Sequence, residues 1–165
     1  MQTNPLGILR LDHVSWTVRE LEPVVAFYER VFGATVQYRL GPVDSAALPR
    51  AQDGRDWTDA HLGVEGARLE LAMLALPGGA RIEIFAYDQP ASHATRPAPS
   101  HQIGSYHLGI EVQDLEAAAQ ILQDNGCPLF DRIAFSEGPT AGSRFQRFLD
   151  PWQNIFELSV HTRPN

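Results

Sequence analysis

The chain has 165 residues, 44% of them hydrophobic, and a formal net charge of -7. This length is usual for one domain that buries a substantial core. The negative charge argues against nucleic acid as a partner, because a surface that binds phosphate backbones needs clustered Lys and Arg. No apolar run is long enough to cross a membrane, and residues 1–13 lack the features of a signal peptide. We therefore expect a cytoplasmic protein without membrane contact.

Two segments of the sequence match each other in order. The first, residues 13–33, reads HVSWTVRELEPVVAFYERVFG, and the second, residues 107–126, reads HLGIEVQDLEAAAQILQDNG. Each opens with a histidine in an apolar, strand-like run and continues into a helical pattern that a glycine closes. The repeat predicts one strand and one helix, twice.

After each helical pattern the hydrophobic period changes to about two residues, which is typical of strands. The expected strands cover residues 35–40, 68–75 and 81–87 in the first half, and 131–135, 143–149 and 154–160 in the second. Each half therefore has the order βαβββ. We expect one α+β domain over residues 1–165, with modules at 8–88 and 105–161 joined by a linker at 89–104. Residues 41–66 interrupt the first module as either a lid or a surface loop.

The repeat places four potential metal ligands in equivalent positions. His13 and His107 stand on the opening strands, and Glu83 and Glu157 stand on the closing strands. The His–Glu spacing is 70 residues in the first half and 50 in the second, and the insertion at 41–66 can absorb the difference. Both glutamates lie in apolar runs, where an inward-facing carboxylate needs a partner.

Two imidazoles and two carboxylates suit one divalent ion, and the mixed nitrogen and oxygen set permits Zn, Ni, Co, Mn or Fe. A structural zinc site would usually contain thiolates. Taken singly, a strand histidine is more often packed or exposed than a ligand, and a buried glutamate more often pairs with an arginine such as Arg81 or Arg147. The agreement of four positions favours the metal site.

Four segments of the sequence carry a resemblance to a known family. They are LDHVSWTVRELEPVVAFYERVFG, RIEIFAY, YHLGIEVQDLEAAAQILQDNG and FLDPWQNIFELSV. With them the chain resembles the vicinal oxygen chelate superfamily, which includes glyoxalase I, methylmalonyl-CoA epimerase, extradiol dioxygenases, and bleomycin or fosfomycin resistance proteins. The resemblance implies two tandem βαβββ modules whose curled mixed sheets form a central metal cavity.

The resemblance also implies a site and a reaction class. It assigns His13, Glu83, His107 and Glu157 as metal ligands, with Glu157 the first candidate base and Glu83 the second. Related glyoxalases and epimerases remove a proton next to a metal-chelated carbonyl through an enediolate or enolate. The expected function is therefore a divalent-metal-dependent isomerase, epimerase or lyase that acts on a small carbonyl or vicinal-oxygen substrate.

Two other functions stay open from the sequence. Extradiol dioxygenases of the superfamily use two His and one Glu on Fe(II), an arrangement against which Glu83 argues. A noncatalytic small-molecule binding or resistance protein is the other alternative, and such relatives usually lack the ligands. Among the isomerases, the linker resembles that of the epimerases, whereas Glu83 resembles the ligand of glyoxalase I. Small members of the superfamily often dimerise, so we expect a homodimer.

Overall fold

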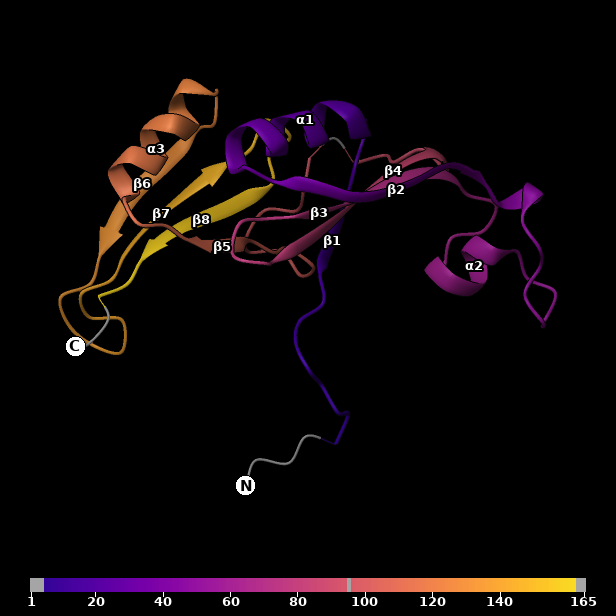
Figure 1. Ribbon diagram of the computed structural model, residues 1–165, viewed down its shortest axis with the longest axis horizontal. Coiled ribbons are helices and arrows are strands. Elements are labelled where there is room, and N and C mark those ends of the chain that lie inside the picture. The colour runs from indigo at the N-terminus through magenta and orange to yellow at the C-terminus, as the bar shows by residue number, and fades with distance from the viewer. Residues whose placement is uncertain (1–4, 95, 163–165) are drawn as a thin grey trace. The chain divides into compact units, whose positions relative to one another are not determined.

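The computed structural model describes residues 5–94 and 96–162, and it divides the chain into two compact units, residues 1–93 and 94–165. Each unit contains one four-stranded sheet and one helix of ten or more residues (Figure 1). The predicted α+β fold of two βαβββ modules is confirmed. No helix in the described residues has the length and apolar content needed to cross a membrane.

The sheet of the first module has the strand order β1-β4-β3-β2. The first and last strands along the chain, β1 and β4, pair in parallel. The β4–β3 and β3–β2 pairs are antiparallel. The bounds are β1 Val14–Val18, β2 Thr35–Asp44, β3 Arg68–Ala75 and β4 Arg81–Gln89. The predicted strand at 68–75 agrees residue for residue with β3. Between β2 and β3 lie a short 3₁₀ helix, Ser45–Ala47, and helix α2, Trp57–Leu62.

Helix α1, Leu21–Phe32, covers one face of this sheet (Figure 1). The apolar residues of α1 recur at helical spacing, so one side of the helix is buried. On that side Tyr28 packs edge to face against Trp16 of β1, with ring centroids 6.2 Å apart. Pro23 lies in the first turn, as predicted, and Gly33 ends the helix with a φ of 64°. A glycine serves here because a side chain at positive φ would be strained.

The second module repeats this plan with the strand order β5-β8-β7-β6. The elements are β5 Leu108–Glu111, α3 Leu115–Asp124, β6 Leu129–Ala134, β7 Arg144–Leu149 and β8 Ile155–Val160. Asp114 caps α3 by accepting a hydrogen bond from the backbone N–H of Ala117 at 2.9 Å, as its type and position predict. Phe148 and Phe156 stack with centroids 5.2 Å apart in the core.

Candidate functional site

His13 and Glu83 come together in the first module. Glu83 lies within β4 directly opposite Ser15 of β1, and His13 stands two residues before Ser15, just ahead of the strand. Because alternate residues of an extended chain face the same side, His13 reaches the face that Glu83 occupies. The His13 Nε2 and Glu83 Oε2 atoms lie 3.4 Å apart, and both side chains are partly exposed.

Asp12 orients the imidazole of His13. Its Oδ2 atom lies 2.8 Å from Nδ1 of His13, and its other oxygen pairs with the guanidinium of Arg81. The hydrogen bond from His13 is the main cause that lowers the pKa of Asp12 below its ordinary value, and Arg81 lowers it further. The ionised carboxylate can only accept, so Nδ1 carries a proton, and in the neutral tautomer the lone pair lies on Nε2.

This arrangement fits a cation in chemical terms. In the neutral imidazole, the Nε2 lone pair and the carboxylate oxygen of Glu83 are both acceptors that face each other. A proton or a positive ion between them relieves that conflict. A carboxylate on the far nitrogen of a histidine is also the usual support of a metal ligand. The residues present therefore suit the imidazole and carboxylate half of a metal site.

His107 and Glu157 repeat the same backbone register in the second module. Glu157 lies within β8 opposite Gly109 of β5, and His107 stands two residues before Gly109. Both predicted histidines thus precede their strands by one residue instead of lying inside them. The offset between histidine and glutamate is the same in both sheets. His107 is exposed, and the structure records no hydrogen bond or ion pair between it and Glu157 in residues 96–162.

Glu157 contacts an arginine. Arg147 lies opposite it on the neighbouring strand β7 and donates a hydrogen bond from Nε to Oε2 at 3.0 Å. The alternative to a metal-ligand role, a glutamate paired with an arginine, is therefore what this structure shows for Glu157. Arg81, the other arginine considered, contacts Asp12 instead of a glutamate. Among the described residues, no three His, Cys, Asp or Glu side chains are grouped so that they could hold a metal ion.

A cavity of about 570 Å³ opens on the face of the second sheet that carries Glu157 and Arg147. Strand alternation explains its lining, because the opposite face holds the residues buried beside α3. Its apolar lining comes from Phe130, Ile133, Phe135, Phe145 and Ile155. A mostly apolar wall with a few polar groups is the usual make-up of a small-molecule site.

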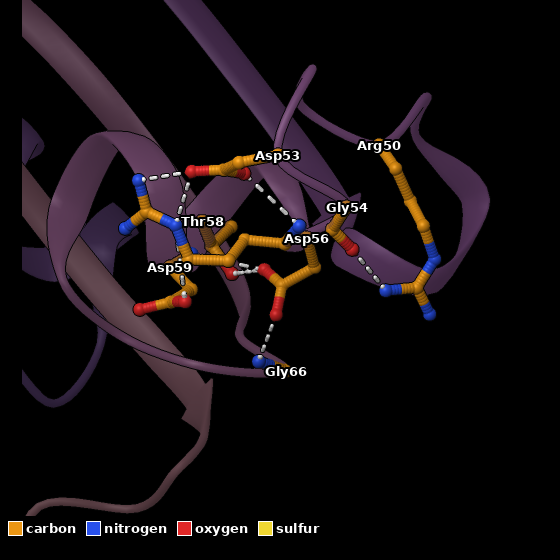
Figure 2. A network of polar contacts seen from close by, with 8 residues as sticks. Arg50, Asp53, Gly54, Asp56, Thr58, Asp59 and Gly66 are labelled. Atoms are coloured by element: carbon orange, nitrogen blue, oxygen red, sulfur yellow. Dashed lines mark hydrogen bonds and ion pairs between the residues drawn. The ribbon is translucent and has the colours of Figure 1, made fainter.

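The insertion between β2 and β3 is an ordered part of the first module. Asp56 accepts hydrogen bonds from the hydroxyl of Thr58 and from the backbone N–H groups of Asp59 and Gly66, so it caps α2 and ties the helix to the start of β3 (Figure 2). These bonds lower the pKa of Asp56 to about 2. Leu62 and Val64 pack on a buried cluster with Phe85 and Tyr87, which follow Glu83 along β4.

Comparison with known proteins gives a consistent family. The family model described as the glyoxalase/bleomycin resistance protein/dioxygenase superfamily matches residues 10–158. A 2-epi-5-epi-valiolone epimerase from Actinomyces is 35% identical over 155 residues, which cover 92% of this chain and 79% of that protein. An uncharacterised Bacillus subtilis protein, YwkD, is 34% identical over 85 residues, covering 52% of this chain and 62% of that protein.

Solved structures share the fold at lower identity. A glyoxalase family protein from Bacillus cereus superposes with a TM-score of 0.74 at 21% identity, covering 99% of both chains. The fosfomycin resistance protein FosX from Listeria monocytogenes, in complex with Mn(II) and sulfate, gives a TM-score of 0.56 at 16% identity and covers 94% of both chains. The match over residues 10–158 and the epimerase relative together show that this chain belongs to the glyoxalase/bleomycin resistance protein/dioxygenase superfamily.

Proposed function

We propose that the protein is a divalent-metal-dependent epimerase that inverts a carbon next to the carbonyl of a small polyhydroxylated ketone. The observation that carries the proposal is the His–Glu pair, which recurs at the same register offset in both sheets. The epimerase relative, similar over 92% of this chain, supports the reaction class, and the suffix of the compound in its name, 2-epi-5-epi-valiolone, denotes a ketone. The coarse prediction of an isomerase or epimerase agrees with that relative.

The proposed metal ligands are His13, Glu83, His107 and Glu157. Two imidazole nitrogens and two carboxylates form a donor set that Zn, Ni, Co, Mn and Fe all accept. A divalent ion bound there would draw electron density from the substrate carbonyl and so favour loss of the neighbouring proton. Asp12 supports this role of His13, because it fixes the ring with Nε2 toward Glu83.

A carboxylate of the chain acts as the base in this proposal. The C–H bond next to the carbonyl breaks as an O–H bond forms on the carboxylate, and the electron pair moves onto the carbonyl oxygen. Solvent water delivers a proton to the opposite side of the carbon and so gives the epimer, and the carboxylate then releases its proton to solvent, so no oxidant or reductant is needed. Glu157 remains our first candidate and Glu83 our second. Because Arg147 holds Oε2 of Glu157, Oε1 would have to loosen its bond to the metal in order to accept the proton.

Proton exchange in heavy water tests the proposal. The protein is purified without a metal-affinity tag, stripped with a chelator and reloaded separately with Zn, Ni, Co, Mn or Fe. It is then incubated with 2-epi-5-epi-valiolone in D₂O, and NMR follows deuterium at the carbons beside the carbonyl and the appearance of an epimer. We expect both signals with at least one metal. Their absence with all five would reject the proposal, and oxygen uptake with Fe(II) and a catechol would favour ring cleavage.

The assembly and location of the protein are also proposals. We retain the homodimer expected from the small size of the chain and its resemblance to dimerising relatives, and we retain the cytoplasm as its location. Light scattering on a size-exclusion column measures the first directly. A mass near that of one 18.3 kDa chain at micromolar concentration would reject the dimer.

A further inference from the structure

The two modules differ at the residue that faces the glutamate. In the first module Met73 of β3 lies opposite Glu83, and its side chain is buried. In the second module the equivalent position on β7 is Arg147, opposite Glu157. The duplication thus keeps the glutamate and changes its neighbour from an apolar thioether to a guanidinium. The two side chains differ in character, because Met73 is apolar and buried, whereas the charged side chain of Arg147 stays partly exposed.

Charge compensation of Glu157 uses only one nitrogen of Arg147. The guanidinium carries five N–H donors, and the contact at 3.0 Å comes from Nε alone. In residues 96–162 the structure records no acceptor for Nη1 or Nη2 of Arg147. The side chain is 40% exposed, whereas that of Glu157 is 21% exposed, and both line the cavity of about 570 Å³. The N–H groups of Nη1 and Nη2 are therefore available to donate hydrogen bonds to a ligand in that cavity.

The rest of the lining indicates the chemistry of the ligand. The aromatic rings of Phe130, Phe135 and Phe145 present flat apolar surfaces, which suit the C–H faces of a saturated ring. Asp131 and Glu157 are carboxylates and Arg147 is a cation, so the lining residues by themselves, before any metal ion is bound, carry no excess positive charge that would hold a phosphate or carboxylate. A neutral ring with hydroxyl groups on its edge satisfies both the apolar walls and the guanidinium donors.

We propose that Arg147 is a substrate-binding residue whose Nη1 and Nη2 atoms donate hydrogen bonds to ring hydroxyls of a neutral cyclic polyol, while Nε holds Glu157 in place. This inference rests on the proposed function and adds to it the residue that recognises the substrate. It follows that Arg147 couples two tasks. The same planar group sets the position of the candidate base and the position of the ring that loses the proton.

The kinetic test replaces Arg147 with the residue that the first module uses. Because the equivalent position of β3 holds a methionine, Arg147→Met suits the scaffold. With 2-epi-5-epi-valiolone we expect KM to rise about ten- to a hundredfold, the range for loss of hydrogen bonds from a charged donor. Arg147→Lys should recover part of this loss. The control is Arg144→Met on the same strand, since Arg144 pairs with Glu116 of α3 on the other face.

Substrate analogues separate recognition from a structural role. Each of two analogues of the ketone lacks one ring hydroxyl, and kcat/KM is measured for wild type and Arg147→Met. A hydroxyl bound by Arg147 should matter to the wild type and should make little difference to the variant. An equal loss in both proteins for every analogue would overturn the inference, as would a KM of Arg147→Met within twofold of the wild type.

A binding measurement keeps this inference distinct from the proposed function. The ¹H–¹⁵N signal of the Arg147 Nε–H group, assigned by its disappearance in Arg147→Lys, is followed while 2-epi-5-epi-valiolone is added. We expect this signal to move and that of Arg144 to stay. If the ketone moves the Arg147 signal of the wild type without exchange or epimerisation, the proposed function fails and Arg147 recognition stands. If turnover occurs while the signal and KM are insensitive to Arg147, the inference fails and the proposed function stands.

Discussion

Asp12 and His13 are neighbours in the chain, and their side chains also meet, with Oδ2 of Asp12 2.8 Å from Nδ1 of His13. The contact turns the other ring nitrogen toward Glu83. Asp12 was not among the residues that we predicted for the site, although it directly precedes the histidine in the motif LDHVSW. Its position makes it a support of the proposed ligand His13.

We expect Asp12→Asn to weaken metal binding about 10- to 100-fold, because the carboxylate that fixes the ring and its tautomer is lost. Calorimetric titration of the chelator-treated protein with Zn or Mn measures the effect. Asp88→Asn is the matched control, since Asp88 pairs with Arg68 at the surface of the same module. Equal affinities of Asp12→Asn and wild type would contradict a role of His13 as ligand through Nε2.

The two glutamates should differ in their effect on rate. If Glu157 is the base, Glu157→Gln lowers kcat about 10²- to 10⁴-fold, because an amide does not accept the proton. Glu83→Gln should have the smaller effect. Because both residues are proposed ligands, exchange rates in D₂O are compared per bound metal, measured by elemental mass spectrometry. The reverse ranking would move the role of base to Glu83.

The network around Asp56 predicts a dependence of stability on pH. Hydrogen bonds from Thr58, Asp59 and Gly66 lower its pKa from 3.8 to about 2 in the folded protein (Figure 2). A depressed pKa stabilises the fold above the ordinary value, and this contribution is lost as the pH falls from about 3.8 through about 2. Urea unfolding should show wild type more stable than Asp56→Asn at pH 6, and the gap should shrink below pH 4. A gap that stays constant down to pH 2 would contradict this assignment.

Thr58 links α2 to the start of β3 through a buried hydrogen bond. Its hydroxyl oxygen accepts from the backbone N–H of Ala67 at 3.1 Å, and neither residue has exposed surface. Thr58→Val keeps the shape and leaves that N–H without an acceptor, so we expect a loss of about 1–3 kcal/mol in the free energy of unfolding. Thr58→Ser retains the acceptor and should cost about 1 kcal/mol for the lost methyl. Chemical denaturation of both variants provides the comparison.

Gly41 occupies a place where a side chain does not fit. It has a φ of 119°, and a Cβ atom there would come within 2.8 Å of the backbone of Glu70 on the neighbouring strand. We expect Gly41→Ala to lower the free energy of unfolding by at least about 2 kcal/mol. Gly63, with a φ of 70° and open space around it, is the control and should lose only about 1 kcal/mol as alanine. Similar losses would show that β2 yields at this point.

Much of the fold could be predicted because the same strand–helix sequence pattern occurs twice, at residues 13–33 and 107–126. The change in hydrophobic period from 3.6 to two residues separates α1 from the strands that follow it. The duplicated His and Glu positions correspond to the same register in both sheets, with the histidine two residues before the residue opposite the glutamate. Two strands of the first module were predicted too short: β4 runs two residues past the predicted end at Tyr87, and β2, predicted to end at Leu40, continues to Asp44 through Gly41 and Pro42. Proline usually ends a strand, but β2 is an edge strand with a register shift between Leu40 and Val43, so the missing N–H is tolerated.

The partners of the glutamates could not be predicted in the same way. Which residue of β7 faces Glu157 depends on the register of the hairpin, and a shift of one residue would turn Arg147 to the other face. The sequence therefore named Arg147 only as one of two possible partners. The support of His13 by Asp12 depends on side-chain torsions that periodicity does not report. Both contacts depend on strand register and side-chain conformation, which the sequence pattern does not specify even where it predicts the strand correctly.

The parallel pairing of the first and last strands in each module has a consequence for how the site forms. His13 and Glu83 stand at opposite ends of the first module's sequence and meet only because β1 joins β4. During synthesis the ribosome must therefore release all four strands before this pair exists. Since β1 lies at the sheet edge beside β4 alone, a nascent chain that stops after β3 leaves β1 without a partner strand and His13 without Glu83. Closure of the sheet and assembly of the His–Glu pair are thus one event. A metal that binds the pair would therefore stabilise the completed first module and no earlier folding stage.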